Sequence, residues 1–84
     1  MGEITAVEEN VSVISRFEGG KFKPVRFQWR GRTHRVREVT GCWAAHDGQY
    51  KIYHFAVVSD ADDYYEMSFH TRDMSWYVDR MMTG

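Results

Sequence analysis

Arginine side chains supply the densest group of potential binding residues in this sequence. They gather in and just before the stretch FQWRGRTHRVREV, residues 27–39, around a single glycine. A guanidinium group binds a carboxylate or a phosphate through two parallel hydrogen bonds. The predicted chemistry is therefore the binding of an acidic partner. The candidate contact surface consists of Arg26, Arg30, Arg32, Arg35 and Arg37.

Several partners can balance this charge. The chain itself can do so through Glu38, Glu66 or the acidic residues 60–63. The acidic half of a second copy can do so in a homodimer, and an unknown macromolecule, protein or nucleic acid, can do so in a complex. Single-stranded nucleic acid also needs aromatic rings on which its bases stack. The rings that the sequence offers for stacking are Tyr50, Tyr64 and Tyr77.

Two histidines form a second candidate group. If the strands pair as argued below, His54 and His70 are diagonal neighbours on one sheet face, with Glu66 near His54. Diagonal neighbours lie roughly 7–8 Å apart, within reach of a shared metal ion. No motif with typical metal-ligand spacing supports this reading, so we interpret the histidines as residues of a wet or interfacial face. We expect no metal and no cofactor.

Cys42 is the one cysteine and the only candidate thiol nucleophile. A catalytic cysteine needs a nearby base and a group that orients the base. His46 is close in sequence, but no third group is evident, so we interpret Cys42 as a buried structural residue. His34 is also expected in the core, beside Phe27, neutral and hydrogen-bonded. We predict no catalytic residues and a protein that is not an enzyme.

The length and composition indicate a single small domain. With 84 residues, the chain has room for one modest core, built largely from aromatic residues. One cysteine allows no internal disulfide and fits a reducing compartment, and the acidic N-terminus does not resemble a signal peptide. We therefore expect a cytoplasmic protein. Charge is uneven, because residues 16–37 hold eight of the 11 lysines and arginines and only one acid.

Apolar and polar residues alternate with a period of two through most of the chain, which predicts half-buried strands. Helix signals are weak, and the best is a short turn within residues 4–9. We expect residues 1–9 to form an N-terminal tail or short turn and residues 10–82 to form one β domain. The predicted strands begin near Val11, Val25, Thr33, Tyr50, Tyr64 and Ser75.

The register follows from keeping apolar residues on one face. With Arg30 and Gly31 as a two-residue turn, the predicted pairs are Trp29–Arg32, Gln28–Thr33, Phe27–His34, Arg26–Arg35 and Val25–Val36. For the fourth, fifth and sixth strands, the predicted core pairs are Val57–Tyr65, Phe55–Met67, Tyr53–Phe69, Phe69–Trp76 and Met67–Val78. This pattern predicts an all-β fold, a six-stranded antiparallel meander that curls into a small SH3-like or partly open barrel.

The order of these features resembles a small bacterial all-β domain family of unknown function. The resembling residues are WRGR (29–32), VREV (36–39) and Trp43, preceded by Val11 and Val13 and followed by YEM (65–67), Arg72-Asp73 and WYV (76–78) with Arg80. His34 stands where the family usually has Tyr or Phe. The resemblance implies no activity, cofactor or catalytic residue. Some members lie near genes for Y-family-polymerase-like proteins of mutagenic repair, which implies a nucleic-acid setting by association.

The sequence thus predicts a non-enzymatic interaction module that contacts protein or nucleic acid through a basic β-hairpin face. The alternative is a homo-oligomeric structural domain without a nucleic-acid role, and a small enzyme is a third reading.

Overall fold

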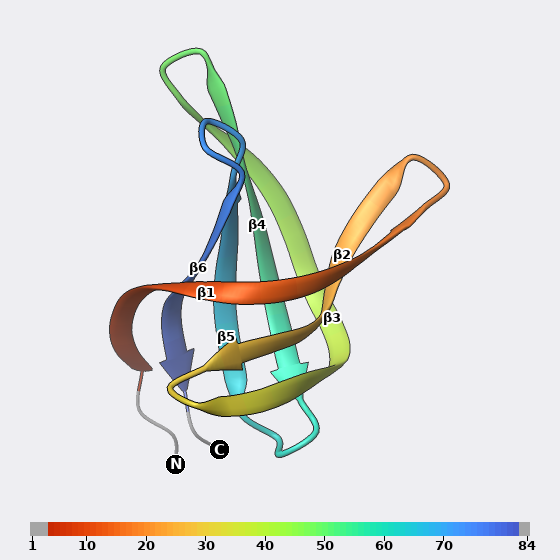
Figure 1. The fold of residues 1–84 in the computed structure, drawn as a ribbon, viewed down its shortest axis with the longest axis vertical. Helices are drawn as coiled ribbons and strands as arrows, with labels where there is room; N and C mark the ends of the chain where they lie inside the picture. Colours follow the sequence, from red (N-terminus) through yellow and green to blue (C-terminus); the bar gives the residue numbers. More distant parts are fainter. Residues whose placement is uncertain (1–3, 83–84) are drawn as a thin grey trace.

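A computed structural model describes residues 4–82 of the chain, and these form six antiparallel strands in meander order (Figure 1). The strands are β1 (Ile4–Glu18), β2 (Lys21–Trp29), β3 (Arg32–Asp47), β4 (Tyr50–Ser59), β5 (Tyr64–His70) and β6 (Ser75–Met82). Each strand pairs with the next, and β1 also pairs with β6, so the sheet closes into a ring. The all-β meander barrel expected from the alternation is confirmed. The described residues include no helix, and so none long and apolar enough to cross a membrane.

The ring is uneven because two long strands each serve two sheets. The first part of β1 pairs with β6, and its second part, from Ser12 onward, pairs with β2. Likewise β3 pairs with β2 near its start and with β4 from Val36 onward. The two long hairpins, β1–β2 and β3–β4, project separately at one end of the molecule (Figure 1).

The short turn expected within residues 4–9 is wrong, because Ile4 already belongs to β1. This part of the strand is paired with β6, from Ile4 with Met82 to Val11 with Trp76. A bulge lies between Ala6 and Glu9 and interrupts the alternation that would mark a strand. The partner strand lies at the other end of the sequence, so a local pattern carries no trace of the pairing.

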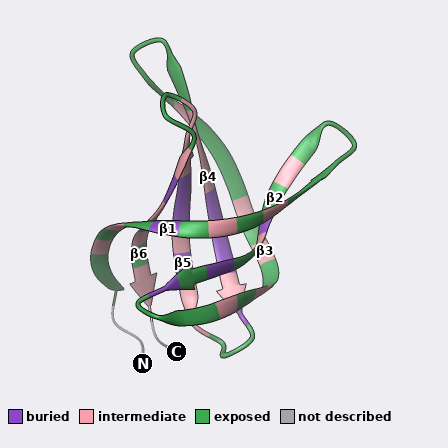
Figure 2. Ribbon diagram, viewed as in Figure 1, coloured by how far each residue is buried: buried purple, intermediate pink, exposed green. Residues whose placement is uncertain are grey.

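The buried core is a cluster of aromatic and aliphatic side chains from every strand except β3, whose partly buried Val36 and Val39 pack against it. Figure 2 marks the buried positions along the ribbon. Its buried members are Val11, Phe27, Trp29, Phe55, Val57, Tyr65, Met67, Trp76 and Val78. The predicted pairs of β4 with β5 and of β5 with β6 are all present, which places Phe55, Val57, Tyr65 and Met67 on the inner face. His34 is half-buried and stacks on Phe27, with ring centroids 4.9 Å apart, and its Nδ1 lies 3.5 Å from the hydroxyl of Tyr65.

The β2–β3 hairpin has the predicted register over four residue pairs, from Trp29–Arg32 to Arg26–Arg35. Arg30 and Gly31 both have positive φ, at 53° and 75°, as a two-residue type I′ turn requires. The predicted pair of Val25 with Val36 is absent. Val25 is the extra residue of a bulge between β1 and β2, and Val36 pairs with Ser59 of β4 instead. Because a bulge bends its strand, β2 turns away from β3 at this point.

Candidate functional site

The outer side of strands β1, β2 and β3 carries a like-charged pair. Arg26 of β2 lies directly opposite Arg35 of β3. On the β1 side of β2, Arg26 lies directly opposite Ile14. The next row along the same face is Ser12, Gln28 and Thr33. We call this surface the arginine face; it consists of Ser12, Ile14, Arg26, Gln28, Thr33 and Arg35. Facing residues on antiparallel strands have Cβ atoms about 5 Å apart, so the two positive charges oppose sheet formation.

Arg26 and Arg35 are both exposed, and no ion pair joins either to an acidic residue within the described part of the chain. Shallow hollows of about 290 and 260 Å³ flank Arg26 on its two sides. The smaller hollow is lined by both arginines and by Asp60, a carboxylate at one end of the face. The face therefore offers two guanidinium groups, a half-exposed isoleucine and shallow relief to a partner.

Arg30 is exposed but lies outside the arginine face, where it pairs with an acidic residue of the same chain. Its guanidinium donates to both carboxylate oxygens of Glu9, from Nη2 at 2.6 Å and from Nε at 3.3 Å, and lies 4.4 Å from the Trp29 ring centroid. The buried Trp29 indole donates to the same carboxylate at 2.8 Å. The hydrogen bonds from Arg30 and Trp29 lower the pKa of Glu9. Sequence reasoning missed Glu9, because only the long-range pairing of β1 brings it to the turn.

Arg37 and Arg32 also lie apart from the arginine face. Arg37 follows the point where β3 leaves β2, and it forms an ion pair with Asp62 of the β4–β5 loop. Arg32 pairs across the turn with Trp29, on the opposite pleat of β3 from Arg35. The structure thus places the five arginines of the predicted surface in several environments, and it brings Arg26 and Arg35 together.

The three tyrosines named as possible stacking rings all lie outside the arginine face. Tyr50 is exposed at the start of β4, opposite Asp47. Tyr64 is half-buried and donates its hydroxyl proton to Glu66 at 2.9 Å. Tyr77 packs edge-on against His70, with ring centroids 4.7 Å apart. The residues that form the arginine face include no aromatic ring.

The two histidines lie on the outer face of β4 and β5 in the predicted register, His54 opposite Ser68 and His70 opposite Ile52. His54 stacks on Trp43 with ring centroids 5.3 Å apart. The Ser68 hydroxyl donates to Asp79 at 3.1 Å and lies 3.1 Å from His70 Nε2. Burial raises the pKa of Asp79. Within residues 4–82, no three or more His, Cys, Asp or Glu side chains gather as metal ligands would.

Serine, histidine and aspartate occur together here, but in an order that differs from a hydrolytic triad. In a triad the histidine stands between the other two and takes the serine proton. Here Ser68 stands between His70 and Asp79, donates to the carboxylate and is only 1% exposed. The geometry is that of a partly buried polar network in which the buried Ser68 hydroxyl is hydrogen-bonded.

The prediction that Cys42 is buried is wrong, because its side chain is exposed. Cys42 lies opposite the core residue Phe55, so it is on the inner side of β3. At this point β2 has already turned away, and no strand of the described chain covers that side of β3. His46, four residues further along the same strand, lies roughly 13 Å away at Cα, too far to act as a base for Cys42.

These observations define the chain as a small all-β domain with a closed antiparallel sheet. No protein-family model matches the chain, and neither a curated protein nor a solved structure matches it.

Proposed function

We propose that this protein is a non-enzymatic interaction module that binds an acidic surface of another protein through the arginine face. The observation that carries the proposal is the facing pair Arg26–Arg35. A like-charged cross-strand pair costs stability unless another group compensates it. Arg30 and Arg37 form ion pairs within the chain, whereas neither Arg26 nor Arg35 does so among the described residues, although Asp60 lines a hollow with both. A carboxylate that bridges the two guanidinium groups would supply the compensation.

Two further features favour a protein over a nucleic acid as the partner. Ile14 is 50% exposed and stands in the same row as the two arginines, so it offers apolar contact area that a phosphate backbone does not use. The arginine face itself contains no ring on which bases could stack.

The test compares acidic probes of the two partner classes, peptide and nucleic acid, each carrying a fluorescent label at one end. Fluorescence anisotropy measures binding of a polyglutamate peptide, a single-stranded oligonucleotide and a DNA duplex at about 50 mM salt. We expect polyglutamate to bind and the double variant Arg26→Gln, Arg35→Gln to lose most of that binding. Arg72→Gln, which removes an exposed arginine outside the face, is the matched control.

Three outcomes would overturn the proposal. If polyglutamate binds both variants equally, the face has no role in recognition. If the nucleic acids bind tighter and the double variant reduces the salt slope by about two, the partner is nucleic acid. If sedimentation shows a dimer that the double variant dissociates, the acidic partner is a second copy, whose exposed Asp60 and Asp62 lie in its β4–β5 loop.

A further inference from the structure

The ring of strands is open between the first half of β2 and the second half of β3. The two strands pair only from Arg26–Arg35 to the turn. Before Arg26, β2 has β1 on one side and no strand of the described chain on the other. From Val36 to Asp47, β3 has only β4 as a strand neighbour. The free edge of the first half of β2 and the free edge of the second half of β3 therefore border the same opening between the hairpins, and each carries unpaired backbone groups.

Side chains from both hairpins line a cleft in this opening. Two adjoining hollows, of about 290 and 390 Å³, share Lys21, Phe22, Cys42 and Phe55 as lining residues. Val39 also lines the smaller hollow, and Trp43 and Tyr53 also line the larger one. We call this the interhairpin cleft; its apolar surface consists of Phe22, Val39, Cys42, Trp43, Tyr53 and Phe55. Trp43 stacks on His54 and is nevertheless 47% exposed, so much of its ring remains free for a ligand.

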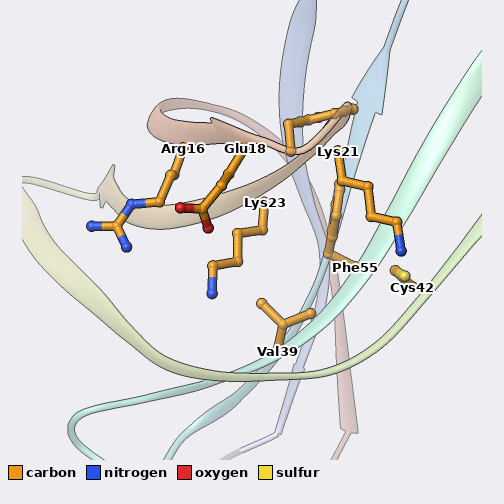
Figure 3. A pocket seen from close by; sticks show the side chains of 8 residues that line it. Arg16, Glu18, Lys21, Lys23, Val39, Cys42 and Phe55 are labelled. Carbon is orange, nitrogen blue, oxygen red and sulfur yellow. The ribbon is translucent and has the colours of Figure 1, made fainter.

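One lip of the cleft is basic. Arg16, Lys21 and Lys23 extend from the β1–β2 hairpin over the opening, with Glu18 among them, while Val39 and Cys42 come from β3 on the other side (Figure 3). The residues that β3 and β4 contribute to the two hollows include no carboxylate. The cleft therefore combines an apolar floor with a positive lip, and its charge complements an acidic ligand.

The two edges differ in how they are protected against strand pairing. The β2 edge carries Pro24, which has no N–H to donate, between Val25 and the charged Lys23. Lysine and proline are the residues that natural sheets use to block an exposed edge. By contrast, residues 41–45 of β3 are Gly-Cys-Trp-Ala-Ala, without charge or proline, and they run in regular register with β4. The unprotected edge is therefore that of β3.

We propose that the interhairpin cleft binds an extended acidic segment of another protein, which adds as a strand to the free edge of β3. Main-chain hydrogen bonds to residues 41–47 supply affinity, as in other cases of strand addition. Alternate side chains of the segment point to the same side, so an apolar residue fills the floor over Phe22 and Phe55. Acidic residues at the flanks of the segment meet Arg16, Lys21 and Lys23. The site is separate from the arginine face and does not rest on the function proposed above.

The first test selects ligands from a phage library of random nine-residue peptides against the full chain. We expect selected peptides to carry β-branched or aromatic residues in alternation, flanked by Asp or Glu. A synthetic peptide of the selected sequence then protects Cys42, the one cysteine, from alkylation by iodoacetamide. A library that yields no enrichment, basic peptides or peptides that leave the alkylation rate unchanged overturns the proposal.

The second test distinguishes main-chain hydrogen bonding between the peptide and β3 from nonspecific binding. N-methylation of alternate peptide bonds in the selected peptide removes the donors of one edge only. We expect one methylated series to lose at least about fivefold in affinity per donor, and the series offset by one residue to lose little. Equal losses in both series, or none, contradict strand addition. This comparison changes the peptide alone, so the fold of the protein is not at risk.

The third test uses variants of the lip. Lys21→Gln together with Lys23→Gln should weaken the peptide roughly 3- to 10-fold, as expected for rim charges, and thermal unfolding should be unchanged. The control is Arg26→Gln with Arg35→Gln, which should leave peptide affinity as it was. If the control variant abolishes binding instead, the peptide occupies the arginine face and the cleft proposal fails. A second copy as the occupant would be revealed by a concentration-dependent dimer in sedimentation that the peptide displaces, and this result would also overturn it.

Discussion

Glu9 of β1 and Arg30 of the β2–β3 turn are 21 positions apart in the sequence and form a two-bond ion pair, with the shorter bond 2.6 Å long. The same carboxylate accepts the indole proton of Trp29, the last residue of β2. Arg30 has a positive φ of 53°, which is unfavourable for a residue other than glycine. The contact with Glu9 thus supports the turn conformation and links β1 to the hairpin that carries Arg26 and Arg35.

The first prediction concerns the charge of Glu9. Its pKa is lowered, so its ionised form contributes stability above the usual value of 4.5, and that contribution is lost as the pH falls through the lower pKa of the folded state. We expect Glu9→Gln to lower the melting temperature at pH 7 and to match the unmodified protein at pH values below the carboxylate range. Thermal unfolding followed by circular dichroism at both pH values measures this. A difference of equal size at low pH would mean that packing, not charge, is lost.

The second prediction concerns Asp79, whose shift has the opposite sign. Because burial raises its pKa, the folded state favours the protonated acid, and stability is lost as the pH rises through that pKa. Asp79→Asn removes the partly buried charge and keeps an oxygen that can accept from Ser68. We expect the variant to be more stable than the unmodified protein at pH 7 and equal to it at low pH. Denaturant unfolding at several pH values provides the test, and a variant less stable at neutral pH would contradict it.

The third prediction concerns Phe22, which fills the open end of the barrel. Its ring lies 5.2 to 6.0 Å, centroid to centroid, from those of Tyr53, Phe55, Phe69 and Trp76. We expect Phe22→Ala to cost about 2 kcal/mol of unfolding free energy, below the range for a fully buried phenylalanine because the side chain is only partly buried.

Phe17 offers a matched control on the same hairpin. It stacks on Phe22 with ring centroids 5.4 Å apart, but it is 78% exposed. Phe17→Ala should cost less than about 1 kcal/mol, and urea titration of both variants measures the two losses. Equal losses for the two variants would show that the hairpin is held by its own stacking rather than by the ring of aromatic partners.

The fourth prediction concerns the glycine of the β2–β3 turn. Gly31 has a φ of 75° and nothing within 4 Å of an added Cβ, so an alanine there meets backbone strain without a steric clash. We expect Gly31→Ala to cost about 1 kcal/mol. Gly41→Ala is the control, because its Cβ would lie 3.9 Å from Ala56, an ordinary contact, and should change stability by less than about 0.5 kcal/mol. A larger loss at Gly41 in chemical denaturation would contradict this account.

Local alternation was sufficient to predict the meander and most of its register. In β4, β5 and β6, each predicted core pair joins strands that are adjacent in sequence, and each is present. A slip by one residue would have turned Phe55 and Met67 to solvent, so burial alone selects the pairing. The Arg26–Arg35 pair followed from the same reasoning.

Local alternation could not predict long-range strand pairing or bulges. The strand identity of Ile4 depends on Met82 at the far end of the chain, and the partner of Arg30 is Glu9 for the same reason. Cys42 has the sequence context of a buried residue, yet it is exposed because β2 bends away at Val25.

The sequence by itself thus determined most of the strands, the order in which they follow one another and the two faces of most hairpins, because a period of two is a local property. It did not determine the first part of β1. Only the tertiary structure decided which charges are compensated and where the ring stays open. Those outcomes depend on how a bulge bends β2 and on how β1 reaches both β6 and β2. They are set by contacts between residues far apart in the chain, which no pattern of neighbouring residues records.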